Sequence, residues 1–433
     1  MKFVLRHSYR YVKKNPKLKK LVKPLWGLSP LFLSLPYRLL KRSYSPPSIV
    51  FDTAKDWWEL SADQKSATTF YKKVQEPESF VRTKPIVLPE DQALLSYLEP
   101  KIDLREGFVI GLPNARVWGE GNIITKNNEL ILEVSGTFLD NKDAYLRHGK
   151  NSKYISNSFP KLPVVKKLKG KSVVLAAHAG SGYYHWLIEV LPRLYLLEKA
   201  GIDFNSIDHF IVNSLVPGFV RETLEMLGIP LKKVVETHWK PHILAEELIV
   251  PSLVGNFFEV PKWTSKFFGS RFKRYIKPRV EGKKVYISRK DAGHRRIVNE
   301  DDVTAFLESE GFETYIFETM SMQEKIEILS QASVVLSPHG AGLANIVFCH
   351  PGVPVVELTH FSLMASACWN IGDNNDMPYY TLASTPKVPM EEQLRLQTLT
   401  LQERAMYHLF IDIDKLEKVL RQVEKAVPTY QNP

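Results

Sequence analysis

Short apolar runs alternate with helix-compatible stretches through the second half of the chain. Buried strands are expected at residues 284–288, 313–317, 334–337 and 353–358, and helices at 301–310, 321–331 and 342–349. Ser321 and Glu324 have the spacing of a capping box, which would open the second of these helices. Strands and helices that alternate at this pitch predict a parallel, doubly wound sheet, whose ligands bind at the carboxyl ends of its strands.

The first half of the chain has a less regular pattern. Glycines punctuate short apolar alternations at residues 108–137, which indicates antiparallel strands. Further strands are expected at 172–177, 210–212 and 248–250, and helices at 184–200, 218–227 and 264–275. A chain of 433 residues favours two domains. We expect an arm at 1–50, an N-terminal domain at 51–278, a C-terminal domain at 279–400 and a C-terminal helix at 401–433.

The formal charge of +11 is concentrated at one end of the sequence. Residues 1–50 hold twelve of the 58 Lys and Arg residues and none of the 47 Asp and Glu residues. The remaining residues therefore carry 46 basic and 47 acidic side chains, which argues against a nucleic-acid-binding body. The two cysteines, Cys349 and Cys368, are too few for a disulfide framework and favour a reducing compartment.

The basic arm also contains Trp, Phe and several Leu residues, interrupted by Pro24, Pro30 and Pro36. It is too short and too broken for a spanning helix of about 20 residues, and it lacks the cleavage site of a secretory signal. Each Lys or Arg near an anionic leaflet contributes about 1 kcal/mol of binding. We predict a peripheral anchor on an anionic membrane surface; a solvated arm or a protein-docking arm is the alternative.

A glycine-rich turn, Ser337-Pro338-His339-Gly340-Ala341-Gly342, joins the expected strand at 334–337 to the expected helix at 342–349. A helix start presents free backbone N–H groups and the positive end of a dipole, and such a site binds anions, most often phosphate. Glycines used only for tight packing are the alternative. We select His339, Gly340, Ala341 and Gly342 as donors to a phosphate group.

Basic and acidic side chains follow neighbouring strands at the same sheet edge. Arg289, Arg295 and Arg296 come after the strand at 284–288, and guanidinium groups match phosphate oxygens in geometry and charge. Glu357 ends the strand at 353–358, where a carboxylate can accept from ribose hydroxyls. A solvated basic loop and a helix cap are the respective alternatives. Together with the turn, these residues favour a diphosphate site.

A second group of residues lies in the first half of the chain. His185 and Glu189 are four residues apart and share one helix face, so the pair could act as a general base. Tyr183, Tyr184 and Trp186 offer flat rings of the kind on which sugars stack. A surface His–Glu pair and a core tryptophan are the alternatives.

Three blocks resemble one known family. They are residues 182–194 (GYYHWLIEVLPRL), residues 286–300 (YISR…RRIVNE) and residues 338–358 (PHGAGLAN…PG…VEL). In this order they are similar to bacterial members of glycosyltransferase family 61, often labelled capsular polysaccharide biosynthesis proteins. The resemblance covers residues 100–390. The sequence has no P-loop, Gly-x-Ser-x-Gly elbow or His-Glu-x-x-His helix.

The resemblance implies a GT-B architecture, in which two Rossmann-like domains face each other across a cleft. It implies an inverting transfer from a nucleotide-sugar, with no bound metal and no cofactor, onto a bacterial surface polysaccharide or lipid-linked glycan. Glu189 would be the general base, with His185 second. Arg289, with Arg295 or Arg296, would face the donor phosphates, and Glu357 would lie near the ribose.

These implications give an enzyme that acts as a peripheral protein at the cytoplasmic face of the membrane. Two other classes fit the same sequence features. One is a non-catalytic scaffold that binds glycans or nucleotides, and the other is a phosphotransferase or nucleotidyl hydrolase that uses the same anion turn.

Overall fold

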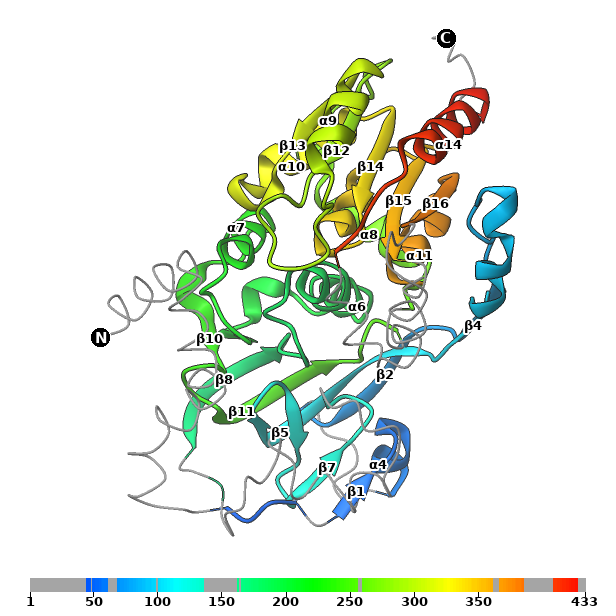
Figure 1. The fold of residues 1–433 in the computed structure, drawn as a ribbon. Helices are drawn as coiled ribbons and strands as arrows, with labels where there is room; N and C mark the ends of the chain where they lie inside the picture. The colour runs from blue at the N-terminus through cyan, green and yellow to red at the C-terminus, as the bar shows by residue number, and fades with distance from the viewer. Residues whose placement is uncertain are drawn as a thin grey trace. The chain divides into compact units, whose positions relative to one another are not determined.

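The structure is a computed structural model, which describes residues 44–47, 49–60, 68–98, 100–135, 162, 165–255, 259–360, 366–384 and 408–426. The predicted basic arm falls outside these ranges except for its last residues. The chain divides into two compact units, one of residues 1–76 and 106–254 and the other of residues 77–105 and 255–433 (Figure 1).

A mixed sheet forms the base of the first unit, with nine strands among the described residues. Its strands are β1 (Ile49–Phe51), β2 (Phe70–Gln75), β5 (Gly107–Trp118), β6 (Asn122–Ile124), β7 (Glu129–Ile131), β8 (Lys166–Val174), β9 (His209–Val212), β10 (Val234–Glu236) and β11 (His242–Pro251). Neighbours β10, β9, β8 and β11 are parallel, and β11 then pairs antiparallel with β5.

Numbered along the chain, the parallel strands β10, β9, β8 and β11 have the order 3-2-1-4, which is that of the first four strands of a Rossmann sheet. The antiparallel strands β5, β6 and β7 are those predicted at residues 108–137. The first unit is thus Rossmann-like in its parallel part. The antiparallel strands extend the same sheet, because β11 pairs on its other side with the long antiparallel strand β5.

The helices of the first unit are α4 (Ala54–Leu60), η3 (His185–Val190), α6 (Arg193–Lys199), η4 (Phe204–Ser206), α7 (Gly218–Met226) and η5 (Leu231–Lys233). Trp57 of α4 is buried among residues of β5, β8 and β11. The single helix predicted at 184–200 is two elements, because Pro192 has no backbone N–H with which to continue it. The first of them, η3, is a π-helix in which the N–H of Leu191 donates to the carbonyl of Trp186.

The second unit contains the predicted parallel sheet. Its elements are β3 (Glu78–Val81), η1 (Pro89–Tyr97), β4 (Lys101–Leu104), α8 (Trp263–Arg271), η6 (Lys273–Tyr275), β12 (Lys284–Ile287), α9 (Glu300–Ser309), β13 (Phe312–Tyr315), η7 (Phe317–Thr319), α10 (Met322–Gln331), β14 (Val334–Pro338), η8 (Ala341–Phe348), β15 (Val355–His360), α11 (Ser366–Asn374), β16 (Tyr379–Ser384) and α14 (Ile413–Ala426). Five parallel strands lie in the order β13-β12-β14-β15-β16. This is the doubly wound order 2-1-3-4-5.

Alternate residues of these strands face opposite sides of the sheet. Tyr286, Leu336 and Val356 pack with residues of α9 and α14 on one side. Ile287 faces the other side, where its Cγ2 lies near Gly342 at the start of η8. The predicted capping box at the start of α10 is present, since Ser321 and Glu324 satisfy each other's backbone N–H.

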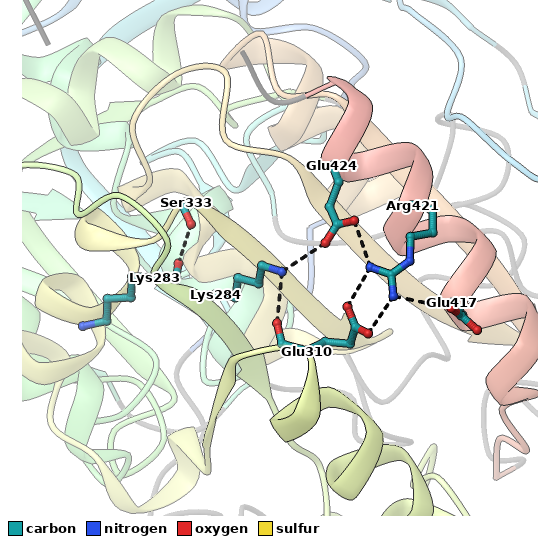
Figure 2. Close-up of polar contacts among 7 residues, drawn as sticks. All are labelled: Lys283, Lys284, Glu310, Ser333, Glu417, Arg421 and Glu424. Atoms are coloured by element: carbon teal, nitrogen blue, oxygen red, sulfur yellow. Dashed lines mark hydrogen bonds and ion pairs between the residues drawn. The ribbon is translucent and has the colours of Figure 1, made fainter. Parts of the chain in front are cut away.

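Helix α14 is joined to the end of α9 by charged side chains (Figure 2). Arg421 donates to both carboxylate oxygens of Glu310, at 3.0 and 2.8 Å, and to Glu424 at 2.9 Å. Lys284 of β12 donates to the backbone carbonyl of Glu310 at 3.0 Å. The C-terminal helix is therefore an integral part of the second unit.

The boundary between the units differs from the predicted position at residue 278. It lies after Val254, because α8 belongs to the second unit. The rings of Phe268 and Phe272 contact Phe348 of η8 edge-on, with centroids 5.5 and 5.3 Å apart. Residues 77–105 also belong to the second unit, where Ile86 pairs with Tyr380 at the edge of the sheet.

Among the described residues, no helix is both long enough and apolar enough to cross a membrane.

Candidate functional site

The loops after β12 and β14 lie at the switch point of the second unit's sheet. From β12 the chain continues to β13 on one side, and the later strands β14, β15 and β16 are added on the other side of β12. In doubly wound sheets, ligands bind in the crevice that opens at this point. Arg289 follows β12 and Gly340 follows β14, so the topology brings the two predicted phosphate-binding segments together.

The guanidinium of Arg289 lies directly over Gly340. A Cβ atom placed on Gly340 would be 2.1 Å from Nη1 and 2.7 Å from Cζ of Arg289. Gly340 has φ 169°, an extended conformation that any residue adopts, so the glycine is required by the guanidinium rather than by the backbone. Burial lowers the pKa of Arg289, whose Nε is buried and has no hydrogen-bond partner in the described part of the chain.

Arg295 joins Arg289 at this turn. Its Nε donates to the backbone carbonyl of His339 at 3.1 Å. Burial, followed by the nearby charge of Arg289, lowers the pKa of Arg295 to about 10. Its φ is 53°, in the left-handed region that non-glycine residues seldom occupy, at a cost of about 1–3 kcal/mol. The guanidinium groups of Arg289 and Arg295 are close enough for one charge to lower the pKa of the other group, and Arg295 has a strained backbone. This arrangement favours an anion between or beside the two groups.

Arg296 does not join this pair. It is exposed, its N–H donates to Nδ1 of His408 at 3.2 Å, and its charge lowers the pKa of His408 after the larger effect of burial. Its carbonyl accepts from Leu409, so the backbone at this position is bound to the C-terminal segment. The structure therefore favours Arg295 over Arg296 as the companion of Arg289.

The turn itself offers fewer backbone donors than the sequence indicated. The N–H of His339 donates to the carbonyl of Leu358 at 2.7 Å, which removes it from the predicted set. Gly340, Ala341 and Gly342 form the N-cap and first two positions of η8, where helix geometry leaves N–H groups without partners inside the helix. These three amides remain the candidate donors to a phosphate.

Glu357 is engaged with His339. Its Oε1 lies 2.5 Å from Nδ1 of the imidazole, and only 3% of Glu357 is exposed. A buried carboxylate in this position is better suited to orienting the imidazole of His339 than to the predicted contact with a ribose. The His339 side chain is 14% exposed and sits beside the carbonyl that holds Arg295.

The second predicted site is built on the loop between β8 and η3. The side chain of Asn213, just after β9, accepts from the N–H of Ala177 at 3.1 Å and donates to its carbonyl at 2.7 Å. Gly180 packs against the same amide, since a Cβ there would be 2.3 Å from Oδ1. This clamp at the carboxyl ends of two parallel strands sets the course of the chain into η3.

Arg193 stabilises the start of the same loop through hydrogen bonds to its backbone carbonyls. It is fully buried, and its guanidinium donates to the carbonyls of Pro251 at 2.6 Å, Ser252 at 3.2 Å, Leu175 at 3.2 Å and Ala176 at 3.3 Å. Burial lowers its pKa to about 9. Arg193 therefore ties together the chain segments that leave β8 and β11.

His185 and Glu189 are in contact, as their spacing predicts. Nδ1 of His185 lies 2.7 Å from Oε2 of Glu189, and the two side chains are 21% and 27% exposed. The other oxygen of Glu189, Oε1, is buried and has no hydrogen-bond partner among the described residues. The pair thus has the composition and geometry of a proton acceptor, in which Oε2 of Glu189 contacts His185 and Oε1 remains to accept a hydrogen bond.

The three aromatic residues differ in their surroundings. Trp186 is 1% exposed and its indole N–H donates to the hydroxyl of Thr223 at 2.8 Å, so this ring belongs to the core rather than to a sugar-stacking surface. Tyr184 is also buried, edge-on to His185. Tyr183 is half-buried against Phe219 and is the ring of the three most available for stacking.

A second His–carboxylate pair lies in the same unit and was not predicted. Nδ1 of His178 is 3.0 Å from Oε2 of Glu120, which also accepts from the N–H of Ala179 at 3.3 Å. Ala179 has φ 55°. Burial lowers the pKa of nearby His238, against the opposing charges of Glu236 and Glu120. The sequence does not indicate this pair, because Glu120 lies in the turn between β5 and β6, far from His178 along the chain.

Among the described residues, no group of three or more His, Cys, Asp or Glu side chains could hold a metal ion.

Residues 183–356 match the family model described as Glycosyltransferase 61. The matched segment contains the His185–Glu189 pair, Arg289, Arg295 and the turn at Gly340, and it ends one residue before Glu357. No curated protein matches the chain. Residues 183–356 are therefore similar to glycosyltransferase family 61, and this match supports a glycosyltransferase.

Proposed function

We propose that this glycosyltransferase moves a sugar from a nucleotide-sugar donor to a growing bacterial surface polysaccharide or lipid-linked glycan. The transfer inverts the configuration at the anomeric carbon and needs no bound metal. The observation that carries the proposal is the packing of the Arg289 guanidinium on Gly340 at the switch point of the second unit's sheet.

The donor's leaving group is a nucleoside diphosphate, which gains negative charge as the glycosidic bond breaks. Arg289, Arg295 and the amides at the start of η8 supply fixed positive charge and N–H groups at one turn. Such preorganised groups stabilise developing charge without reorganisation during the reaction. The unpaired Nε of Arg289 supports this role, because a buried donor without a partner costs about 1–3 kcal/mol until a ligand satisfies it.

An inverting transfer requires one general base beside the acceptor hydroxyl. We assign this role to Glu189, with His185 holding its Oε2. The buried Oε1 then accepts the hydroxyl proton as the acceptor oxygen attacks the anomeric carbon. Tyr183 would stack on the acceptor sugar, and the arm of residues 1–50 would hold the enzyme to an anionic membrane at the cytoplasmic face.

Product analysis tests the proposal. The purified full chain, given a panel of nucleotide-sugars with oligosaccharide and lipid-linked acceptors, should release nucleoside diphosphate and form a glycosidic bond of inverted configuration. Glu189→Gln should abolish this transfer and leave donor binding unchanged. Glu120→Gln is the matched control, because it alters the other His–carboxylate pair and should retain activity. Release of nucleoside monophosphate, or transfer of a phosphoryl group, would instead identify the phosphotransferase class.

A further inference from the structure

The buried carboxylate of Glu300 contacts the residue that precedes Arg289. Glu300, in the first turn of α9, is 7% exposed. Its Oε1 accepts from the hydroxyl of Tyr286 at 2.7 Å and from the hydroxyl of Ser288 at 2.6 Å. Its Oε2 is buried and has no partner among the described residues. The positive end of the α9 dipole favours a carboxylate at this position.

The two hydroxyls serve different parts of the structure. Tyr286 lies within β12, on the face that packs with α9, and is fully buried. Ser288 is the last residue before Arg289, and its hydroxyl oxygen also accepts from the N–H of Lys290 at 3.1 Å. One hydroxyl can donate once and still accept, so Ser288 links the carboxylate of Glu300 to the backbone beyond Arg289.

The arginine is therefore restrained on both sides. Before it, the N–H of Ser288 donates to the carbonyl of Tyr315 at 2.9 Å. After it, the turn is closed by Lys290, and Nη2 of Arg289 donates to the carbonyl of His294 at 3.2 Å. These contacts direct the guanidinium over Gly340.

We propose that Glu300 and Ser288 are positioning residues of the donor site. The carboxylate fixes the direction of the Ser288 hydroxyl, the hydroxyl holds the turn at Lys290, and the turn keeps Arg289 over Gly340. The inference rests on the proposed function, because it requires Arg289 to bind the diphosphate of the donor.

Four single variants of the full chain test the inference, with inorganic pyrophosphate as the probe and calorimetric titration as the measurement. Ser288→Ala removes the link to Lys290 and leaves Glu300 held by Tyr286, so pyrophosphate should bind about tenfold more weakly, as for the loss of one charge-assisted hydrogen bond. Ser288→Thr keeps the hydroxyl and should restore binding to within about twofold of the wild type.

Tyr286→Phe is the matched control. It removes the Tyr286 hydroxyl, which donates to the same oxygen of Glu300 as Ser288 does. Because Tyr286 lies within β12 and the link to Lys290 is made by Ser288, pyrophosphate affinity should change by less than about twofold. Thermal denaturation of each variant separates lost binding from lost fold. Equal weakening in Tyr286→Phe and Ser288→Ala, or unchanged binding in Ser288→Ala, would overturn the inference.

Arg289→Ala distinguishes the two levels of the proposal. If it abolishes pyrophosphate binding while Ser288→Ala leaves binding intact, the diphosphate site stands and the positioning role fails. If wild-type protein and Arg289→Ala bind pyrophosphate equally, the diphosphate site fails and the positioning role fails with it.

Discussion

Adding one methyl group at Gly340 should displace the guanidinium on which donor binding depends. In Gly340→Ala the new Cβ would stand 2.1 Å from Nη1, 2.7 Å from Cζ and 3.1 Å from Nε of Arg289. The backbone at this position is extended, so alanine adds no strain of its own. All of the effect must come from movement of the arginine.

The size of the movement follows from the contact distances. Ordinary van der Waals contact with a Cβ begins at 3.4 Å, so Nη1 has to retreat by at least about 1.3 Å. A displacement of this size breaks a charge-assisted hydrogen bond, which is worth about 1.5–3 kcal/mol. Affinity for a nucleoside diphosphate should therefore fall about 10- to 100-fold. Stability should change little, because a side-chain terminus rather than the backbone gives way.

Gly342→Ala provides the matched control. Its Cβ would meet only Cγ2 of Ile287 at 3.7 Å, an ordinary contact, so diphosphate affinity should stay within about twofold of the wild type. Calorimetric titration with inorganic pyrophosphate, together with thermal denaturation, measures both quantities. Wild-type affinity in Gly340→Ala, or equal losses in the two alanine variants, would refute the placement of Arg289.

Three further predictions concern the rest of the molecule. Arg193→Ala should lower the free energy of unfolding in urea by at least about 3 kcal/mol, because four buried carbonyls lose their donor; Arg421→Ala, in an exposed ion-pair network, should cost clearly less, and equal costs would contradict this account. Burial lowers the pKa of His238 in the folded protein, so as the pH falls the unfolded chain binds a proton at a higher pH than the folded protein does. The free energy of unfolding should therefore decrease as the pH drops below about 6.5. His238→Gln should reduce this slope of stability against pH, and an unchanged slope would contradict the prediction. Deletion of residues 1–42 should move the protein from vesicles containing anionic phosphatidylglycerol into solution, and retained binding would refute the anchor.

Much of the second unit could be predicted because its signals are local. The apolar runs at 284–288, 334–337 and 353–358 correspond to β12, β14 and β15, and the spacing of Ser321 and Glu324 marks the start of α10. Parallel order follows from the alternation of strands and helices. The meeting of the loops after β12 and β14 then follows from the topology.

The features that were missed depend on contacts between distant parts of the sequence. The place of residues 77–105 rests on the pairing of Ile86 with Tyr380, and the place of α8 rests on the packing of Phe268 against Phe348. No local pattern in the sequence shows either contact.

The individual site residues depend on contacts in the same way. Arg295 and Arg296 are adjacent, yet a positive φ at the first turns only that side chain toward the turn at Gly340. Glu357 lies in the strand at 353–358 where a ribose ligand is expected, but burial beside His339 gives it another partner. Glu120 lies far from His178 in the sequence, so no motif joins them.

Binding of nucleosides and nucleoside diphosphates to the wild-type protein and to Arg289→Ala tests the central claim most directly. Uridine, guanosine, adenosine, cytidine and thymidine and their diphosphates would be compared by calorimetric titration. The wild type should bind at least one diphosphate much more tightly than its nucleoside, and Arg289→Ala should remove most of that difference while leaving the nucleoside affinity unchanged. Equal losses for nucleoside and diphosphate would contradict the account.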